Sequence, residues 1–237
     1  MWKPFGKINE LIIGEDNNKY HINFLRIRNK KLSEKIPFIG NLHFIDQEEI
    51  KKFRTPKRTE EHASGRYLLH HMLRKYYPEI DCSSLEVCRN ENRAPFFNWT
   101  NSRFKHIDLP NFSISSSNDY VIVALCNSEM SIGVDLEKLN QKRTDTLFDF
   151  ISKGRELEQI KSLYGKNGNY NLNRIWTAKE SILKSLRLGF SISPTKIEVL
   201  DNNYEFKSRI NFEGKKLNLI NMILNLNEEY CFSIAYS

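Results

Sequence analysis

Residues 174–186 read Arg-Ile-Trp-Thr-Ala-Lys-Glu-Ser-Ile-Leu-Lys-Ser-Leu, which is the spacing of an amphipathic helix. The apolar residues recur at helical intervals, with good helix formers such as Ala178 between them. On this helix Glu180 and Lys184 stand one turn apart on the same side. The sequence therefore predicts a helix that carries a carboxylate and an ammonium group side by side. The apolar residues are Ile175, Ile182, Leu183 and Leu186.

A second stretch, residues 131–139, alternates apolar and polar residues with the period of a half-buried strand. Asp135 and Glu137 therefore leave this strand on the same face. If the helix covers that face, Glu180 joins them and three carboxylates meet beside Lys184. A hard cation such as Mg²⁺ suits this arrangement, because it prefers oxygen ligands and takes water or phosphate in its remaining positions. The lysine would hold a phosphate oxygen.

Each feature alone has a simpler explanation. An Asp-x-Glu on a strand is usually a solvated face, and a Glu–Lys pair four residues apart is usually a helix-surface ion pair worth a few tenths of a kcal/mol. Spacing alone does not decide between these explanations and a binding site.

Together, the two stretches resemble the signature motifs of the 4′-phosphopantetheinyl transferase superfamily. These motifs are Gly-hydrophobic-Asp-hydrophobic-Glu and, roughly forty residues later, Trp-x-x-Lys-Glu-x-x-x-Lys. In this chain they stand at 133–137 and 176–184. Flanking segments resemble the longer, surfactin-type branch, and the likeness spans about residues 58–190. Those segments are 93–95, 111–115, 119–124 and 150–152 with Glu156.

The resemblance implies a Mg²⁺-dependent enzyme. It would transfer the 4′-phosphopantetheine group from coenzyme A to a serine of an acidic acyl or peptidyl carrier protein, releasing adenosine 3′,5′-bisphosphate. By the same resemblance Asp135, Glu137 and Glu180 hold the metal. Glu180 and Lys184 are the catalytic residues, Glu180 taking the serine proton and Lys184 adding a fixed positive charge.

Residues at six positions are expected to contact coenzyme A through the same resemblance. At Ser116 the family usually has histidine, and a hydroxyl cannot supply the charge of an imidazolium. The serine leaves open weaker coenzyme A binding or a catalytically weak homologue. Arg58 has the alternative of pairing with Glu61 on a basic helix surface. The six residues are Arg58, Arg93, Ser115, Ser116, Asp135 and Lys184.

The expected fold class is α+β. The resemblance implies a pseudo-dimer of two similar halves, 1–127 and 128–237, each a helix packed on a small antiparallel sheet, with coenzyme A bound between them. Periodicity supports a helix over 58–77 and another over 174–186, each followed by strands. The Gly- and Asn-rich residues 164–171 predict a loop. The strands are expected at 84–88, 111–115, 120–125, 195–200, 204–210, 216–224 and 230–235.

The net charge, the cysteine spacing and the lack of long apolar runs limit the classes of partner that we expect. A net charge of +7 favours an acidic partner, either nucleic acid or a carrier protein, but no zinc-finger, RNP-like or glycine-clamp signature supports nucleic acid. The four cysteines form no Cys-x-x-Cys pair, so we expect reduced thiols rather than a zinc site. The sequence has no membrane-length apolar run and no signal-peptide pattern at its start. We therefore expect a cytoplasmic monomer without a membrane partner.

Overall fold

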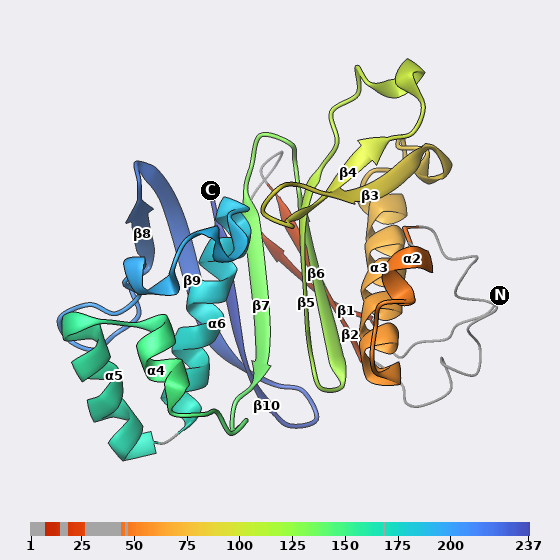
Figure 1. Ribbon diagram of the computed structural model, residues 1–237. Helices are drawn as coiled ribbons and strands as arrows, with labels where there is room; N and C mark the ends of the chain where they lie inside the picture. The colour runs from red at the N-terminus through yellow and green to blue at the C-terminus, as the bar shows by residue number, and fades with distance from the viewer. Residues whose placement is uncertain (1–7, 15–18, 27–43, 46, 168) are drawn as a thin grey trace. The chain divides into compact units, whose positions relative to one another are not determined.

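The computed structural model describes residues 8–14, 19–26, 44–45, 47–167 and 169–237 (Figure 1). The chain forms two compact units. The first consists of Met1–Asn90 and Pro95–Glu129, and the second of Glu91–Ala94 and Met130–Ser237. The sequence did not indicate that the short segment Glu91–Ala94 groups with the second unit. No helix in the described part of the chain is long and apolar enough to cross a membrane.

The first unit is a four-stranded antiparallel sheet with one long helix against it. The strand order is β1-β2-β6-β5, with β1 at Ile8–Ile13, β2 at Tyr20–Arg26, β5 at Asn111–Ser117 and β6 at Tyr120–Cys126. Helix α3 spans Pro56–Tyr76. Around it lie the short helix α2 at Gln47–Ile50 and a hairpin of β3 at Leu85–Arg89 and β4 at Pro95–Trp99.

Local chemistry explains where α3 begins. Thr55 is extended, and its hydroxyl accepts a hydrogen bond from the Arg58 amide at 3.3 Å, so it caps the first turn. Pro56 then occupies a first-turn position, where the proline's missing N–H costs nothing. The helix buries Leu68, Leu69 and Met72 in a core that also contains residues of β6.

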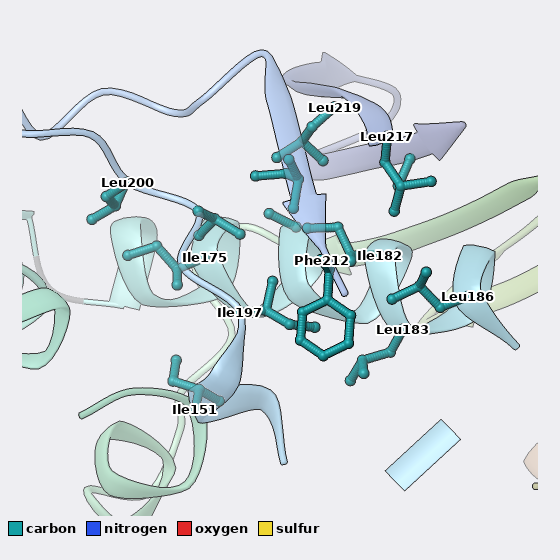
Figure 2. Packing of buried hydrophobic residues seen from close by; sticks show 14 of the residues in the cluster. Ile151, Ile175, Ile182, Leu183, Leu186, Ile197, Leu200, Phe212, Leu217 and Leu219 are labelled. Atoms are coloured by element: carbon teal, nitrogen blue, oxygen red, sulfur yellow. The ribbon is translucent and has the colours of Figure 1, made fainter. Parts of the chain in front are cut away.

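The second unit also consists of a four-stranded antiparallel sheet with a long helix against it, and it has two further α-helices in the part that the structure describes. Its sheet has the order β7-β10-β9-β8, with β7 at Ile132–Lys138, β10 at Glu229–Tyr236, β9 at Lys215–Asn225 and β8 at Arg209–Phe212. Helix α6, Asn169–Leu186, packs on β7, β10 and β9. Helices α4, Thr146–Ile151, and α5, Gly154–Asn167, pack beside it. Figure 2 shows Ile175, Ile182 and Leu186 of α6 among Ile197, Phe212 and Leu217 in the core.

In each unit a strand is followed along the chain by the long helix and later by a hairpin that pairs with that strand. In the first unit β2 leads to α3, and the later β5–β6 hairpin returns so that β6 lies between β2 and β5. In the second unit β7 leads to α6, and the β9–β10 hairpin returns so that β10 lies between β7 and β9. All these pairings are antiparallel.

Two local predictions are wrong. Residues 195–200 are not a strand: they contain a 3-10 helix, Pro194–Lys196, and a single bridge from Leu200 to Phe206. The Glu156 carboxylate accepts the Val199 and Leu200 amides at 2.7 and 3.4 Å, so these two N–H groups cannot donate to a neighbouring strand and pairing stops at the single bridge. Residues 164–171 are mostly helical, because α5 continues to Asn167 and α6 starts at Asn169.

Other boundaries moved or were missed. The strand predicted over 204–210 is wrong for most of its length, because β8 begins only at Arg209. The strands expected near β3, β5, β6, β9 and β10 are confirmed to within a few residues. The sequence reasoning gave no bounds for β1, β2, β4, α2, α4 or α5.

Gly133 permits the closest backbone contact found among the described glycines. A Cβ atom built there would lie 1.9 Å from the Ser181 carbonyl oxygen and 2.3 Å from the Ser185 amide nitrogen. Both atoms are backbone atoms of α6 and cannot rotate away. Strand β7 and helix α6 therefore touch at a point where only glycine fits.

We predict that Gly133→Ala lowers the free energy of unfolding by about 1–3 kcal/mol or more, the usual cost of overpacking, because the helix must shift away from the strand. Urea denaturation measures this. Gly65→Ala is the matched control: its new Cβ would meet only side chains, the nearest atom being in Ile114 at 3.1 Å, and alanine also favours the helix. Equal stability losses in the two variants would contradict the backbone contact as the cause.

Candidate functional site

Asp135 and Lys184 form an ion pair between β7 and α6. The Lys184 Nζ atom lies 2.6 Å from Asp135 Oδ1 and donates to the Val134 carbonyl at 3.2 Å. The Asp135 side chain is only 6% exposed, so this is not a solvated surface pair. Burial lowers the pKa of Lys184, but Asp135 and Glu180 together outweigh burial and hold the pKa above its ordinary value. Lys184 is therefore charged at neutral pH.

Glu180 lies one turn before Lys184 and is the carboxylate without a hydrogen bond. Its Oε1 atom is buried and has no hydrogen-bond partner among the described residues. Burial raises the pKa of Glu180 to about 7, Lys184 opposes this shift, and Asp135 and Glu137 add to it. A carboxylate with such a pKa exists in both protonation states near neutral pH, so it is suited to accept a proton.

Glu137 has a partner that the sequence reasoning missed. Arg143 Nη2 lies 2.9 Å from Glu137 Oε1. Arg143 is held in turn by Asn173 of α6, whose Oδ1 accepts from Arg143 Nε at 2.7 Å. The Asn173 amide donates to the Leu139 and Gln141 carbonyls, both at 2.8 Å. Arg143 follows the strand without any periodic signal, so the spacing of the motifs could not reveal it.

Two of the three expected carboxylates, Asp135 and Glu180, suit a divalent cation, whereas Glu137 is held by Arg143. No group of three His, Cys, Asp or Glu residues in the described part of the chain is arranged as a metal site. The buried Glu180 Oε1 atom nevertheless receives no hydrogen bond from a described residue, and desolvation raises the pKa of Glu180, with Asp135 adding to the shift. Because Mg²⁺ is commonly held by one or two carboxylates plus substrate phosphates, Asp135 and Glu180 fit it. Glu137 would first have to exchange Arg143.

Strand β7 and helix α6 thus bring together the Asp135–Lys184 ion pair and Glu180, whose Oε1 atom receives no hydrogen bond from a described residue. Residues 131–235 match the model of the 4′-phosphopantetheinyl transferase superfamily. The matched segment contains β7 and α6, and hence all four of the residues Asp135, Glu137, Glu180 and Lys184. The match supports this superfamily and, with it, a phosphopantetheine transferase as the general class. No curated protein matches the chain.

The expected coenzyme A contacts are divided between the units. Arg58 lies on α3, exposed, and its Nη1 atom donates to Glu61 at 3.3 Å, which is the alternative that the sequence left open. Ser115 is buried and Ser116 half-buried on β5 of the first unit. Arg93 belongs to the second unit and has a positive φ of 63°. Within the second unit, the structure brings together Asp135 and Glu137 of β7 with Glu180 and Lys184 of α6.

Lys179, the first lysine of the superfamily-like motif, has a structural environment. Its side chain is fully buried, and burial lowers its pKa while Glu156 opposes the shift. The Nζ atom lies 2.5 Å from Glu156 Oε2, 2.6 Å from the Ile151 carbonyl and 3.2 Å from the Pro194 carbonyl. Lys179 therefore joins α6 to the end of α4, to α5 and to the segment after residue 193.

We predict that Lys179→Met lowers the free energy of unfolding by about 3–5 kcal/mol, because it leaves Glu156 buried without its counter-ion. Chemical denaturation is the measurement. The double variant Lys179→Met/Glu156→Gln should recover part of the loss, since no charge is then buried. Lys161→Ala, an exposed lysine on α5, is the surface control. A Lys179→Met variant as stable as that control would contradict the structural role.

Proposed function

We propose that this protein transfers the 4′-phosphopantetheine group of coenzyme A to a serine hydroxyl of an apo acyl or peptidyl carrier protein. The serine oxygen attacks the β-phosphorus and forms the new P–O bond. The bond from that phosphorus to the adenosine 3′,5′-bisphosphate leaving group breaks, and the serine proton leaves with a base. The superfamily match over residues 131–235 supports this reaction class.

The observation that carries the proposal is that the neighbouring carboxylates Asp135 and Glu180 have different environments. Asp135 is neutralised by Lys184, while Glu180 is half-buried, its buried Oε1 atom receives no hydrogen bond from a described residue, and desolvation raises its pKa to about 7. We assign Glu180 as the residue that accepts the serine proton, directly or through a water. Lys184, charged and close to both carboxylates, binds a phosphate oxygen and stabilises charge that grows on the leaving group.

Asp135, Glu180 and, after exchange of Arg143, Glu137 would hold Mg²⁺. A bound Mg²⁺ would neutralise pyrophosphate charge and polarise the reacting phosphoryl group. The protein's own task is to hold these carboxylates and Lys184 in one place, which the contact of α6 with β7 at Gly133 accomplishes.

The remaining sequence-based assignments form part of the same proposal. The shared order of strand, helix and hairpin supports a pseudo-dimer of two related halves, as in the surfactin-type branch. The coenzyme A contacts proposed from resemblance are Arg58, Arg93, Ser115, Ser116, Asp135 and Lys184.

A catalytically weak homologue that binds coenzyme A or a carrier is the second candidate. Ser116 favours it, because the resembling family usually has histidine there. The retained Asp135, Glu137, Glu180 and Lys184 favour the active enzyme. A nucleic-acid-binding module has only the net charge of +7 in its support.

We predict that Glu180→Gln reduces the rate of carrier modification at least about a hundredfold, the usual cost of removing a charged group aimed at a transition state. The midpoint of thermal unfolding should stay unchanged or rise, because the variant removes a carboxylate that is buried without a hydrogen bond. Glu158→Gln, at an exposed position of α5, is the control with the same change in charge. Mass spectrometry of the carrier gives the rates.

Lys184→Ala tests the role of the second lysine of the motif. It should lose transfer to a similar extent and also lose stability, because Asp135 would remain buried without its counter-ion. Wild-type turnover in both Glu180→Gln and Lys184→Ala would reduce the pair to a structural role and remove the main support for the enzyme.

We predict that Ser116→His lowers the KM for coenzyme A with little change in kcat, since it adds a charge-capable phosphate donor whose contact is equal in ground and transition states. Steady-state kinetics at varied coenzyme A concentration measure both constants. A KM that is unchanged or raised would show that Ser116 does not face the nucleotide or that another residue already fills the role.

A further inference from the structure

A basic groove lies in the second unit, outside the residues of the candidate site. It is a cavity of about 610 Å³ lined by residues from three separate stretches of chain. The cations in its lining are Lys153, Lys196, Lys207 and Arg209, and Glu198 is the acid among the lining residues. We use the term basic groove for this cavity and these five charged residues.

The charges of the basic groove are not balanced. Lys207 is paired with Glu198, their side-chain nitrogen and oxygen being 3.5 Å apart. Lys153, Lys196 and Arg209 form no ion pair with any described residue, and all three are exposed. Three positive charges therefore share one concave surface. Like charges gathered in a concavity repel one another, and an anion bound between them would relieve this repulsion.

The walls and floor of the basic groove are held in place. Ile197 and Phe212 line it and belong to the packed core of the unit (Figure 2). One wall is fixed where the Pro194 carbonyl accepts from Lys179 at 3.2 Å. The opposite wall is fixed where the Lys207 amide donates to the Val199 carbonyl at 2.9 Å. The groove is therefore preformed and does not need to be ordered by its ligand.

We propose that the basic groove binds a small molecule that carries a diphosphate or a longer phosphate chain. The cations converge from several segments on one cavity whose volume is in the range of small-molecule sites, roughly 300–1,000 Å³. They do not form the extended stripe that a nucleic-acid backbone needs. Thr195 and Asn211, which also line the groove, supply uncharged hydrogen-bond donors for phosphate oxygens.

This site goes beyond the proposed transfer reaction and shares no residue with it. Lys179 supplies a physical link between the two, because its ammonium group holds the groove wall at Pro194 while the next residue is Glu180.

The test is isothermal titration of the full chain with inorganic pyrophosphate and with tripolyphosphate, without divalent cations. Saturable binding is expected, together with a loss of affinity of at least about tenfold in Lys153→Ala/Lys196→Ala/Arg209→Ala, since a hydrogen bond to a charged group is commonly worth that much. The control Lys52→Ala/Lys142→Ala/Lys161→Ala removes the same charge at exposed positions outside the groove and should retain wild-type affinity.

Three results would overturn the proposal. These are no saturable binding in the wild-type chain, an equal loss of affinity in the two triple variants, and no loss in the groove variant. A single-stranded oligonucleotide that binds the groove more tightly than tripolyphosphate would also contradict a compact ligand. Since none of these measurements uses a carrier protein or coenzyme A, they stand or fall separately from the transfer activity.

Discussion

The contact between β7 and α6 at Gly133 determines the rest of the second unit. Without a Cβ atom at this position, the helix backbone lies directly on the strand, closer than any side chain would permit. This close approach brings Lys184 of the helix within 2.6 Å of Asp135 of the strand. It also holds Glu180 in a half-buried position, where desolvation raises its pKa and Asp135 and Glu137 add to the shift. A glycine in the motif is thus required by geometry.

Three carboxylates of the second unit are paired with cations, whereas one oxygen of Glu180 receives no hydrogen bond from a described residue. Glu156 is matched by Lys179, Asp135 by Lys184 and Glu137 by Arg143. The buried Oε1 atom of Glu180 receives no hydrogen bond in the described part of the chain. A buried carboxylate with an unsatisfied oxygen costs stability, and such costs are typical of functional sites.

The sequence predicted the elements whose signal is periodic and local. The alternation over 131–139 and the helical spacing over 174–186 are confirmed as β7 and α6, and with them the placement of Asp135 beside α6. The failures have causes that the local pattern does not carry, because side chains bond to backbone groups of other elements. Glu156 withdraws the Val199 amide from strand pairing, and Asn171 donates its side-chain amide to the Leu163 carbonyl, joining α5 and α6 where a loop was expected. Arg143 could not be predicted, because its position depends on Asn173, thirty residues away.

The central claim is that the charged residues of β7 and α6 perform phosphopantetheine transfer. The most direct measurement is the intact mass of an apo carrier protein after incubation with the wild-type chain, coenzyme A and Mg²⁺. The account predicts a carrier heavier by one phosphopantetheine group, with an equimolar amount of adenosine 3′,5′-bisphosphate in solution and no change when excess chelator is present. An unmodified mass across fatty-acid, polyketide and peptide-synthetase carriers, or full modification in the chelator, would contradict it.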